Sequence, residues 1–230
     1  AMSLGFQVLP KPHPNDTALL ALLAGVPTPL ISDNMARLFA AGPALRPMHD
    51  GTPMLGFALT VRTRAGDNLL VHKAIDMAGP GDVIVVDAGG DLTNAIIGEI
   101  MARLAQKRGA AGIVIDGAIR DSDALVTMSL PVFAAGVTHR GPYKDGPGEI
   151  NTGAVIGGQY VAPGDIVVGD ADGVLAVPRA EVATIAALAR KQLAAEDATM
   201  KAIAEDTLDR SWVDEALKAR GAAYGTGSAY

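Results

Sequence analysis

Short apolar runs alternate with helical stretches through the middle of the chain. Residues 83–86, 113–115 and 132–134 are rich in Val, Ile and Ala, and each run is short enough to be a buried strand. A helical stretch closed by Gly109 separates the first two runs, and a short one after Asp121 separates the second from the third. Strands that alternate with helices indicate a largely parallel central sheet. The pattern predicts an α/β fold.

The composition suits such a fold. Hydrophobic residues make up 49% of the 230 residues and charged residues 19%, which is enough to form a sizeable core. Aromatic residues are only 4%, so the core consists mainly of Ala, Val, Ile and Leu. Such a core suits Val/Ile strands covered by Ala-rich helices. The length allows one large α/β domain or, alternatively, two small ones.

Capping residues predict two helices before the first strand. Asn15 and Asp16 can cap a helix that runs to about Ala24. Ser32 is expected to cap a second, short helix that Gly42 ends. Alternating residues from 55 to 61 then predict a strand, and a helix follows from Asp67 to about residue 77.

Glycine-rich segments predict loops between the later elements. A loop with Gly89 and Gly90 is expected before a helix that begins at about Ala95 or Gly98. Residues 137–156 predict a long irregular loop, which is either functional or a surface excursion without a role. Two similar Pro-Gly-Asp corners, at 80–82 and 163–165, each lead into an apolar run and predict two similar turns on one scaffold.

The C-terminal region predicts helices and a loose tail. Pro178 introduces a long Ala-rich helix to about residue 206, and Ser211 is expected to cap a last helix. We therefore expect an N-terminal arm, a core domain, C-terminal helices that pack on the core or on a neighbouring subunit, and a flexible tail, over residues 1–14, 15–178, 179–220 and 221–230.

Charge and residue usage argue against several classes of protein. The net charge is −6 and the pI is near 5.1, without a block of Lys or Arg, so no nucleic-acid surface is expected. The absence of cysteine removes disulfides, thiol nucleophiles and Cys-zinc sites. The apolar stretch at 19–31 is too short to span a bilayer. We expect a cytoplasmic protein that does not contact a membrane.

The chemistry is expected at Arg120 and Asp121, which follow the buried strand 113–115 and its Asp116. Ligands of open α/β sheets collect at the carboxyl ends of strands. Arg120 can grip a carboxylate or a 2-oxo group bidentately, and Asp121 is a hard oxygen ligand for Mg²⁺ or Mn²⁺. The alternative is a local salt bridge in which Asp121 caps a helix.

A second candidate segment is Gly98-Glu99-Ile100, near the start of a predicted helix. A helix N-terminus presents free N–H groups and partial positive charge, which can hold an anionic substrate. Glu99 would add a carboxylate beside it. Alternatively, Glu99 is only a favourable acidic residue in a first helical turn.

Together these segments resemble the family of the regulator of ribonuclease E activity A, which also contains 4-hydroxy-4-methyl-2-oxoglutarate aldolases. The family pattern has an acidic residue, twenty residues and then Arg-Asp, as in Glu99 and Arg120-Asp121. A further acid follows two residues later in the family. Here Ala124 stands at that position and Asp123 precedes it, so the chain departs from the family pattern at this one residue. Ser32-Asp33, the second Pro-Gly-Asp corner and residues 172–174 extend the resemblance over nearly the whole chain.

The resemblance implies an αββα sandwich related to swivelling β/β/α domains, assembled as a homotrimer or a hexamer with sites between subunits. It implies that Asp121 holds the metal, that Arg120 contacts the 2-oxo acid and that the amides of Gly98, Glu99 and Ile100 bind its carboxylate. It also implies a metal ligand from the C-terminal helix of a neighbouring subunit, for which Glu196 is the candidate, with Asp197 beside it.

The expected function is a divalent-metal-dependent aldolase that cleaves 4-hydroxy-2-oxo acids, with oxaloacetate decarboxylation as a side activity. A Schiff-base mechanism is the alternative, but Lys73 and Lys107 fit solvated helix faces better. A regulator that binds a ribonuclease without turnover is the main competing function. A phosphohistidine carrier needs a histidine on its Gly-rich loop, and residues 89–95 contain none. A methyltransferase would need a dinucleotide-type glycine fingerprint, which is absent.

Overall fold

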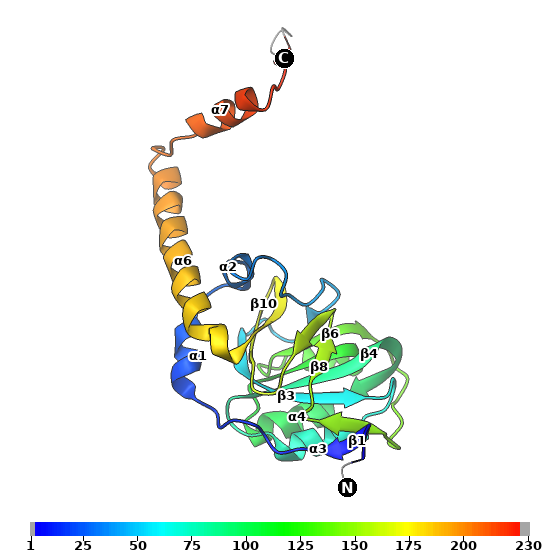
Figure 1. The fold of residues 1–230 in the computed structure, drawn as a ribbon. Helices are drawn as coiled ribbons and strands as arrows, with labels where there is room; N and C mark the ends of the chain where they lie inside the picture. The colour runs from blue at the N-terminus through cyan, green and yellow to red at the C-terminus, as the bar shows by residue number, and fades with distance from the viewer. Residues whose placement is uncertain (1–2, 226–230) are drawn as a thin grey trace. The chain divides into compact units, whose positions relative to one another are not determined.

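The computed structural model describes residues 3–225 (Figure 1). The chain divides into two compact units, residues 1–190 and residues 191–230. Among the described residues, the first unit contains every strand together with Glu99, Arg120 and Asp121, and the second contains the C-terminal helical segment. The boundary that we predict at residue 178 stays a prediction.

The first unit is built on one large mixed sheet. Its strand order is β1-β7-β3-β4-β5-β6-β2, and β10 and β11 extend from β3. Among the described residues, the strands in chain order are β1 (Phe6–Val8), β2 (Arg46–Pro47), β3 (Met54–Thr63), β4 (Asp82–Ile97), β5 (Gly112–Ile119), β6 (Val132–Val137), β7 (Gly148–Ile150), β8 (Ala154–Ile156), β9 (Gln159–Val161), β10 (Ile166–Asp170) and β11 (Gly173–Val177). Strands β8 and β9 pair with each other in a separate two-stranded sheet.

The central strands β3, β4, β5 and β6 pair in parallel, as the alternating pattern predicts. One row of partners crosses all four strands through Leu59, Ile84, Ile113 and Val132, and these side chains are fully buried. A strand buried on both faces reads as a continuous apolar run, which is why the runs were visible in the sequence.

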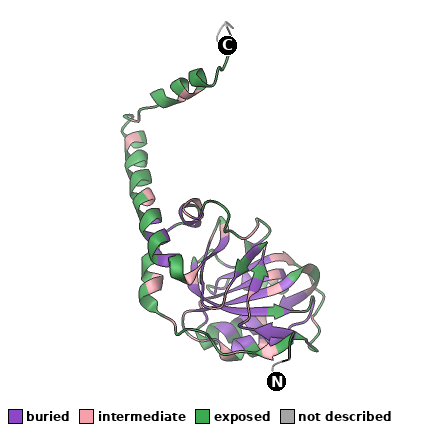
Figure 2. Cartoon of the chain, viewed as in Figure 1, coloured by how far each residue is buried: buried purple, intermediate pink, exposed green. Residues whose placement is uncertain are grey.

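Helices cover one face of this sheet. The helices of the first unit are α1 (Thr17–Leu23), α2 (Thr28–Asp33), α3 (Leu69–Met77), α4 (Glu99–Arg108), α5 (Ser122–Leu125), a 3₁₀ turn (Arg179–Glu181) and the first residues of α6 (Val182–Ala204). Buried side chains of α3, α4 and α5 pack on the sheet in one core, and those of β8 to β11 pack on its opposite face in another. Figure 2 shows the strands largely in purple, the colour of buried residues. Helix α2 contacts β10 and β11. This layering confirms the predicted α/β sandwich.

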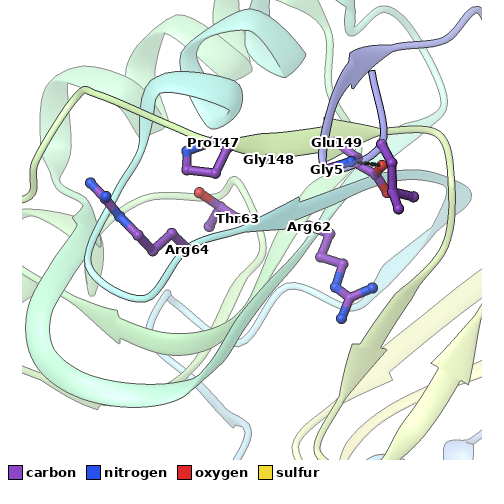
Figure 3. A pocket seen from close by; sticks show the side chains of 8 residues that line it. Gly5, Arg62, Thr63, Arg64, Pro147, Gly148 and Glu149 are labelled. Atoms are coloured by element: carbon purple, nitrogen blue, oxygen red, sulfur yellow. Dashed lines mark hydrogen bonds between the residues drawn. The ribbon is translucent and has the colours of Figure 1, made fainter. Parts of the chain in front are cut away.

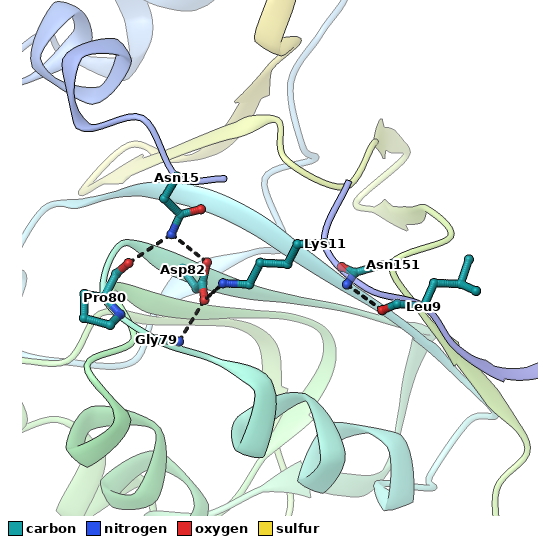
Figure 4. Close-up of polar contacts among 7 residues, drawn as sticks. All are labelled: Leu9, Lys11, Asn15, Gly79, Pro80, Asp82 and Asn151. Atoms are coloured by element: carbon teal, nitrogen blue, oxygen red, sulfur yellow. Dashed lines mark hydrogen bonds and ion pairs between the residues drawn. The ribbon is translucent and has the colours of Figure 1, made fainter. Parts of the chain in front are cut away.

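The N-terminal arm is tied to the amino end of the sheet by a buried carboxylate. Asp82 at the start of β4 pairs with the ammonium group of Lys11 and accepts hydrogen bonds from Asn15 Nδ2 (2.9 Å) and the Gly79 N–H (2.8 Å) (Figure 4). Closer to the N-terminus, the carbonyl of Leu9 in the arm accepts a hydrogen bond from Asn151 Nδ2 (3.0 Å). Charge pairing with every oxygen satisfied makes this a structural anchor.

The second predicted helix begins earlier than expected. Helix α2 spans Thr28–Asp33, so Ser32 lies inside it rather than capping it, and Gly42 does not end it. Pro29 in the first turn supplies a helical φ, and the Thr28 N–H and hydroxyl both donate to the Asp170 carboxylate (2.8 and 2.7 Å). A distant carboxylate therefore caps this helix, which local sequence could not indicate. The first helix, by contrast, begins as predicted, because Asp16 Oδ1 accepts from the Ala18 N–H.

Strand β4 is much longer than predicted. It continues through Gly89 and Gly90, both with φ near 70°, to Ile97, and its pairing with β5 shifts register on the way. The expected loop is therefore an irregular strand, and α4 begins after Gly98, not at Ala95. Strand β5 likewise continues past Asp116 to Ile119. The segment predicted as one irregular loop contains β7 and β8.

The second unit contains the rest of α6 and α7 (Ser211–Ala219). Helix α7 has Arg210 at its N-cap position, so Ser211 is its first residue rather than its cap. Among the described residues, no helix has the length and apolar character needed to cross a membrane. The predicted flexible tail lies partly outside the described residues, because residues 226–230 are not described.

Candidate functional site

Arg120 and Asp121 lie where β5 ends and α5 begins, as predicted. The Arg120 N–H donates to the carbonyl of Ile97 (2.9 Å), which fastens this turn to the end of β4. Asp121 precedes α5 with a left-handed backbone (φ 56°, ψ 40°). That conformation is uncommon for residues other than glycine and is often found at functional sites.

The Asp121 carboxylate reaches the N-terminus of α4. Its Oδ2 accepts a hydrogen bond from the Glu99 N–H (3.0 Å), and Arg120 Nε lies 3.8 Å from the same oxygen. Both side chains are about half exposed. The first helical amide that we expected to hold the substrate is thus occupied by the protein's own carboxylate, and the amide of Ile100 lies in the same first turn. The predicted residues are brought together, but in a different arrangement.

Gly98 is required by this close approach. A methyl group at its Cα would lie 2.2 Å from Asp121 Oδ2 and 2.9 Å from Arg120 Cγ. Its φ of −140° is ordinary for any residue, so the reason for glycine is space and not backbone conformation. The sequence indicated Gly98 as a helix start and, through the family resemblance, as a substrate-binding amide, which stays a prediction; the structure adds its role in the packing of the two segments.

A pocket of about 500 Å³ opens beside this turn, within the size range of small-molecule sites. It is lined by Glu99, Arg120, Asp121, Ser122, Asp123, Ala124, Val137, Thr138 and His139. Asp123 therefore contributes an acid to the pocket although Ala124 occupies the family position. Arg120 gives the pocket a cation that can bind an anionic group, and the three carboxylates give it oxygen atoms that could bind a metal ion.

The donor set fits Mg²⁺ or Mn²⁺ bound largely by water and substrate. Among residues 3–225 no three His, Asp or Glu side chains gather into a metal cluster. Mg²⁺ is commonly held by one or two carboxylates, with waters and substrate oxygens completing the octahedron. The second oxygen of Asp121 can serve as that ligand while Oδ2 holds the Glu99 amide.

The Glu99 side chain is engaged on the surface of α4. Its Oε1 accepts from Arg103 Nε at 2.7 Å, one helical turn away, and both groups are exposed. Such exposed pairs contribute about 0.3–0.5 kcal/mol, so the carboxylate can turn into the pocket at little cost.

The structure adds residues that the motifs did not indicate. Val137, Thr138 and His139 form one wall of the pocket, and Gly141 lies so close to Arg120 that an added Cβ would be 3.3 Å from its Nη1. The signal available in the sequence was the glycine-rich segment after residue 137, for which a functional role was one of two interpretations.

Other predicted residues lie elsewhere. Glu196 and Asp197 belong to the second unit, and their role stays a prediction. Lys73 and Lys107 are not among the described residues that line the pocket. Asp116 accepts from the Gly157 N–H (3.2 Å) and so fastens the β8–β9 turn. Burial raises the pKa of Asp116 above its usual value, and the nearby charge of Asp87 adds to the rise.

A second cavity of about 450 Å³ lies over β3 and β7 (Figure 3). Two arginines line it, but the side chains of Arg62 and Arg64 point away from each other. The Glu149 carboxylate in its wall accepts from the Gly5 N–H and Gln7 Nε2, both at 2.8 Å. These bonds hold the N-terminal arm, and they lower the pKa of Glu149. The Glu149 carboxylate in this cavity therefore serves the fold, so of these two cavities the pocket at Asp121 is the candidate active site.

The fold and site together define a β/β/α-layered protein with an Arg-Asp turn at the end of a parallel strand. The RraA-like family model, Aldolase/RraA, matches residues 28–176, and the chain belongs to this family.

Individual relatives agree. A protein of Halalkalibacterium halodurans named "Putative 4-hydroxy-4-methyl-2-oxoglutarate aldolase" is 40% identical over 80% of this chain and 87% of its own length. An uncharacterized Pseudomonas syringae protein has a similar structure, with a TM-score of 0.75 and 27% identity over 84% of this chain and 95% of its own. The RNA-processing inhibitor RraA of Thermus thermophilus superposes with a TM-score of 0.61 and 32% identity, over 66% of this chain and 92% of its own.

Proposed function

We propose that this protein is a divalent-metal-dependent aldolase that cleaves 4-hydroxy-2-oxo acids, such as 4-hydroxy-4-methyl-2-oxoglutarate, to pyruvate. The observation that carries the proposal is the turn in which Gly98 allows the Asp121 carboxylate and the Arg120 side chain to pack together beside a 500 Å³ pocket. The name of the 40% identical relative supports the substrate class.

Two residues hold the 2-oxo acid end of the substrate in this proposal. The planar guanidinium of Arg120 donates to the substrate carboxylate, which contributes about 1.5–3 kcal/mol as a charged hydrogen bond. Asp121 holds Mg²⁺ or Mn²⁺. The bound cation would polarise the 2-oxo group and stabilise the negative charge of the pyruvate enolate by several kcal/mol.

Glu99 is the proposed base for the proton of the substrate's 4-hydroxyl group. Once its carboxylate leaves Arg103, it can orient a water that takes the proton of the 4-hydroxyl group while passing one of its own protons to the Glu99 carboxylate. The C3–C4 bond then breaks, C4 becomes a carbonyl carbon, and the electron pair remains on the pyruvate part as an enolate. Return of the proton from Glu99 to C3, through the same water, completes pyruvate. Loss of CO₂ from oxaloacetate leaves the same enolate, so we propose oxaloacetate decarboxylation as a companion activity.

The assembly in this proposal is a homotrimer or a hexamer. The carboxylates that line the pocket are Glu99 in the first turn of α4 and Asp121 and Asp123 at the start of α5, and a neighbouring subunit would supply a further ligand. Glu196 of an adjacent subunit is the proposed further ligand.

Pyruvate release with and without a chelator tests the proposal. The purified protein, given 4-hydroxy-4-methyl-2-oxoglutarate and Mg²⁺, is expected to release pyruvate, to lose this activity in excess EDTA, and to regain it when Mn²⁺ or Mg²⁺ exceeds the chelator. Turnover that EDTA leaves unchanged would refute metal dependence, and absence of turnover with either metal would refute the aldolase assignment.

A second function is favoured by one comparison, the 32% identity to a protein described as an RNA-processing inhibitor. A regulator of that kind would act by binding a ribonuclease, without turnover. Inhibition of ribonuclease E cleavage that persists in a variant carrying Asp121→Ala would support this second function, because binding would not need the metal site.

A further inference from the structure

One wall of the pocket contains a histidine that the proposed reaction does not yet use. His139 lines the pocket beside the Arg-Asp turn, together with Val137 and Thr138. Among the described residues that line the pocket, Arg120 and His139 are the two that can carry a positive charge, whereas Glu99, Asp121 and Asp123 carry negative charge.

The excess of acidic over cationic residues in the pocket matters for a substrate that carries two carboxylates. 4-Hydroxy-4-methyl-2-oxoglutarate has one carboxylate beside its 2-oxo group and a second carboxylate on C4. In the proposed function, Arg120 binds the first carboxylate and the cation would bind the adjacent 2-oxo group. The second carboxylate would enter a pocket with three acids, where it needs a donor to offset repulsion and desolvation.

The backbone on both sides of His139 is held in place. The Thr138 N–H donates to the carbonyl of Ile119 (3.0 Å), and the carbonyl of Arg140 accepts from the Ala95 N–H (2.8 Å). Asn94 Nδ2 donates to the next carbonyl, that of Gly141, at 2.6 Å. These bonds attach the segment to the ends of β4 and β5, the same strand ends that carry the Arg-Asp turn.

The far end of the segment is anchored as well. Asp67 is fully buried, and its Oδ2 accepts from the N–H groups of Asp145 (2.7 Å) and Gly146 (3.0 Å). The Tyr143 N–H donates to the carbonyl of Gly66 (2.8 Å). A side chain on a segment anchored at both ends loses little backbone entropy when it binds a ligand, which is the condition for selective recognition.

We propose that His139 binds the carboxylate on C4 of the substrate and thereby makes the site selective for 2-oxo diacids over monoacids. The imidazole N–H donates a hydrogen bond to that carboxylate, and the protonated form adds charge. The inference rests on the proposed function for the identity of the substrate, but it makes a statement about binding that does not require turnover.

Binding of two uncleavable acids tests the inference separately from catalysis. 2-Oxoglutarate has the carbon chain of the proposed substrate without its 4-hydroxyl and 4-methyl groups, and 2-oxopentanoate has the same chain with a methyl group in place of the second carboxylate. Calorimetric titration of the full chain with Mg²⁺ present is expected to show 2-oxoglutarate binding about 10- to 100-fold tighter, as expected for one charged hydrogen bond.

Substitutions assign the preference to His139. His139→Gln is expected to reduce the diacid preference to within about threefold of unity while leaving 2-oxopentanoate binding unchanged. His139→Lys restores a cation and should recover most of the preference. Arg140→Gln is the matched control, because Arg140 is the adjacent exposed cation and does not line the pocket.

The outcomes separate the two hypotheses. A diacid preference that survives in His139→Gln, or an equal loss of affinity for both acids, overturns the inference. A protein without a diacid preference overturns it as well. A protein that shows the preference, loses it in His139→Gln and yet releases no pyruvate supports the inference and refutes the proposed aldolase.

Discussion

Two aspartates, at opposite ends of the neighbouring parallel strands β4 and β5, have contrasting environments. Asp82 begins β4, its side chain is 1% exposed, and its oxygens pair with Lys11, Asn15 and the Gly79 N–H. Asp121 follows β5, its side chain is 44% exposed and its own backbone is left-handed. Its carboxylate accepts a hydrogen bond from the Glu99 N–H. A carboxylate with every oxygen satisfied stabilises a fold, whereas one with unused capacity beside a pocket is available for a ligand.

The largest effect is expected from Asp121→Ala. Loss of the proposed metal ligand should lower pyruvate release about a thousandfold, which corresponds to about 4 kcal/mol of transition-state stabilisation. The free energy of unfolding should fall by only about 1 kcal/mol, the usual cost of losing one helix cap. Steady-state kinetics and urea denaturation measure the two quantities.

A matched control for this variant is Asp76→Ala, which removes an exposed carboxylate of α3 paired with Arg108. Asp76→Ala should change neither the rate of pyruvate release nor the free energy of unfolding appreciably. If Asp121→Ala retained full activity, the contrast between the two aspartates would lose its functional meaning.

The reverse result is expected for Asp82→Ala. This change leaves Lys11 and the Gly79 N–H without their partner and leaves Asn15 Nδ2 with only the Pro80 carbonyl, so the free energy of unfolding should fall by about 3 kcal/mol. Activity per folded molecule should be unchanged, because the residue lies at the amino end of β4, away from the pocket. Denaturation midpoints together with specific activity below the transition would check both statements; a loss of activity in fully folded protein would contradict them.

The smallest effect is expected for Asp116, whose burial is intermediate between those of Asp82 and Asp121. Burial raises its pKa in the folded protein above the ordinary value of 3.8, so the native state holds this proton more tightly than the unfolded state does. Its contribution to stability is therefore fully present below pH 3.8 and is lost as the pH rises through the folded pKa. Solvent screening keeps the effect below about 1 kcal/mol.

Asp116→Asn should remove this part of the pH dependence, because an amide does not titrate while its oxygen can still accept from the Gly157 N–H. Unfolding free energies measured between pH 4 and pH 7 are expected to fall less with rising pH in the variant than in the unchanged protein. Identical slopes would show that Asp116 keeps an ordinary pKa in the folded state.

Local signals explain which parts of the fold and site could be predicted. The buried runs of β4, β5 and β6 were visible because strands covered on both faces need continuous apolar side chains. Helix α4 ends at Gly109 with φ 86°, a position that glycine adopts without strain, and the sequence indicated that end correctly. Arg120 and Asp121 were indicated because they directly follow such a run and match the family's spacing.

Errors arose where distant partners override local preference. Gly89 and Gly90 suggested a loop, but pairing with β5 carries β4 through them to Ile97. Thr28 begins α2 because Asp170, 142 residues away, accepts its N–H and hydroxyl hydrogens. Neither partner is visible to a pattern that extends over a few residues.

By itself the sequence determined the α/β class, the parallel strands and the Arg120-Asp121 turn, because each depends on the period and chemistry of neighbouring residues. Only the tertiary structure decided that Gly98 must lack a side chain, that Asp121 occupies the Glu99 amide, and that His139 faces the same pocket. These features depend on the close approach of segments about 20 residues apart along the chain, and hydrogen bonds and packing across the sheet set that approach.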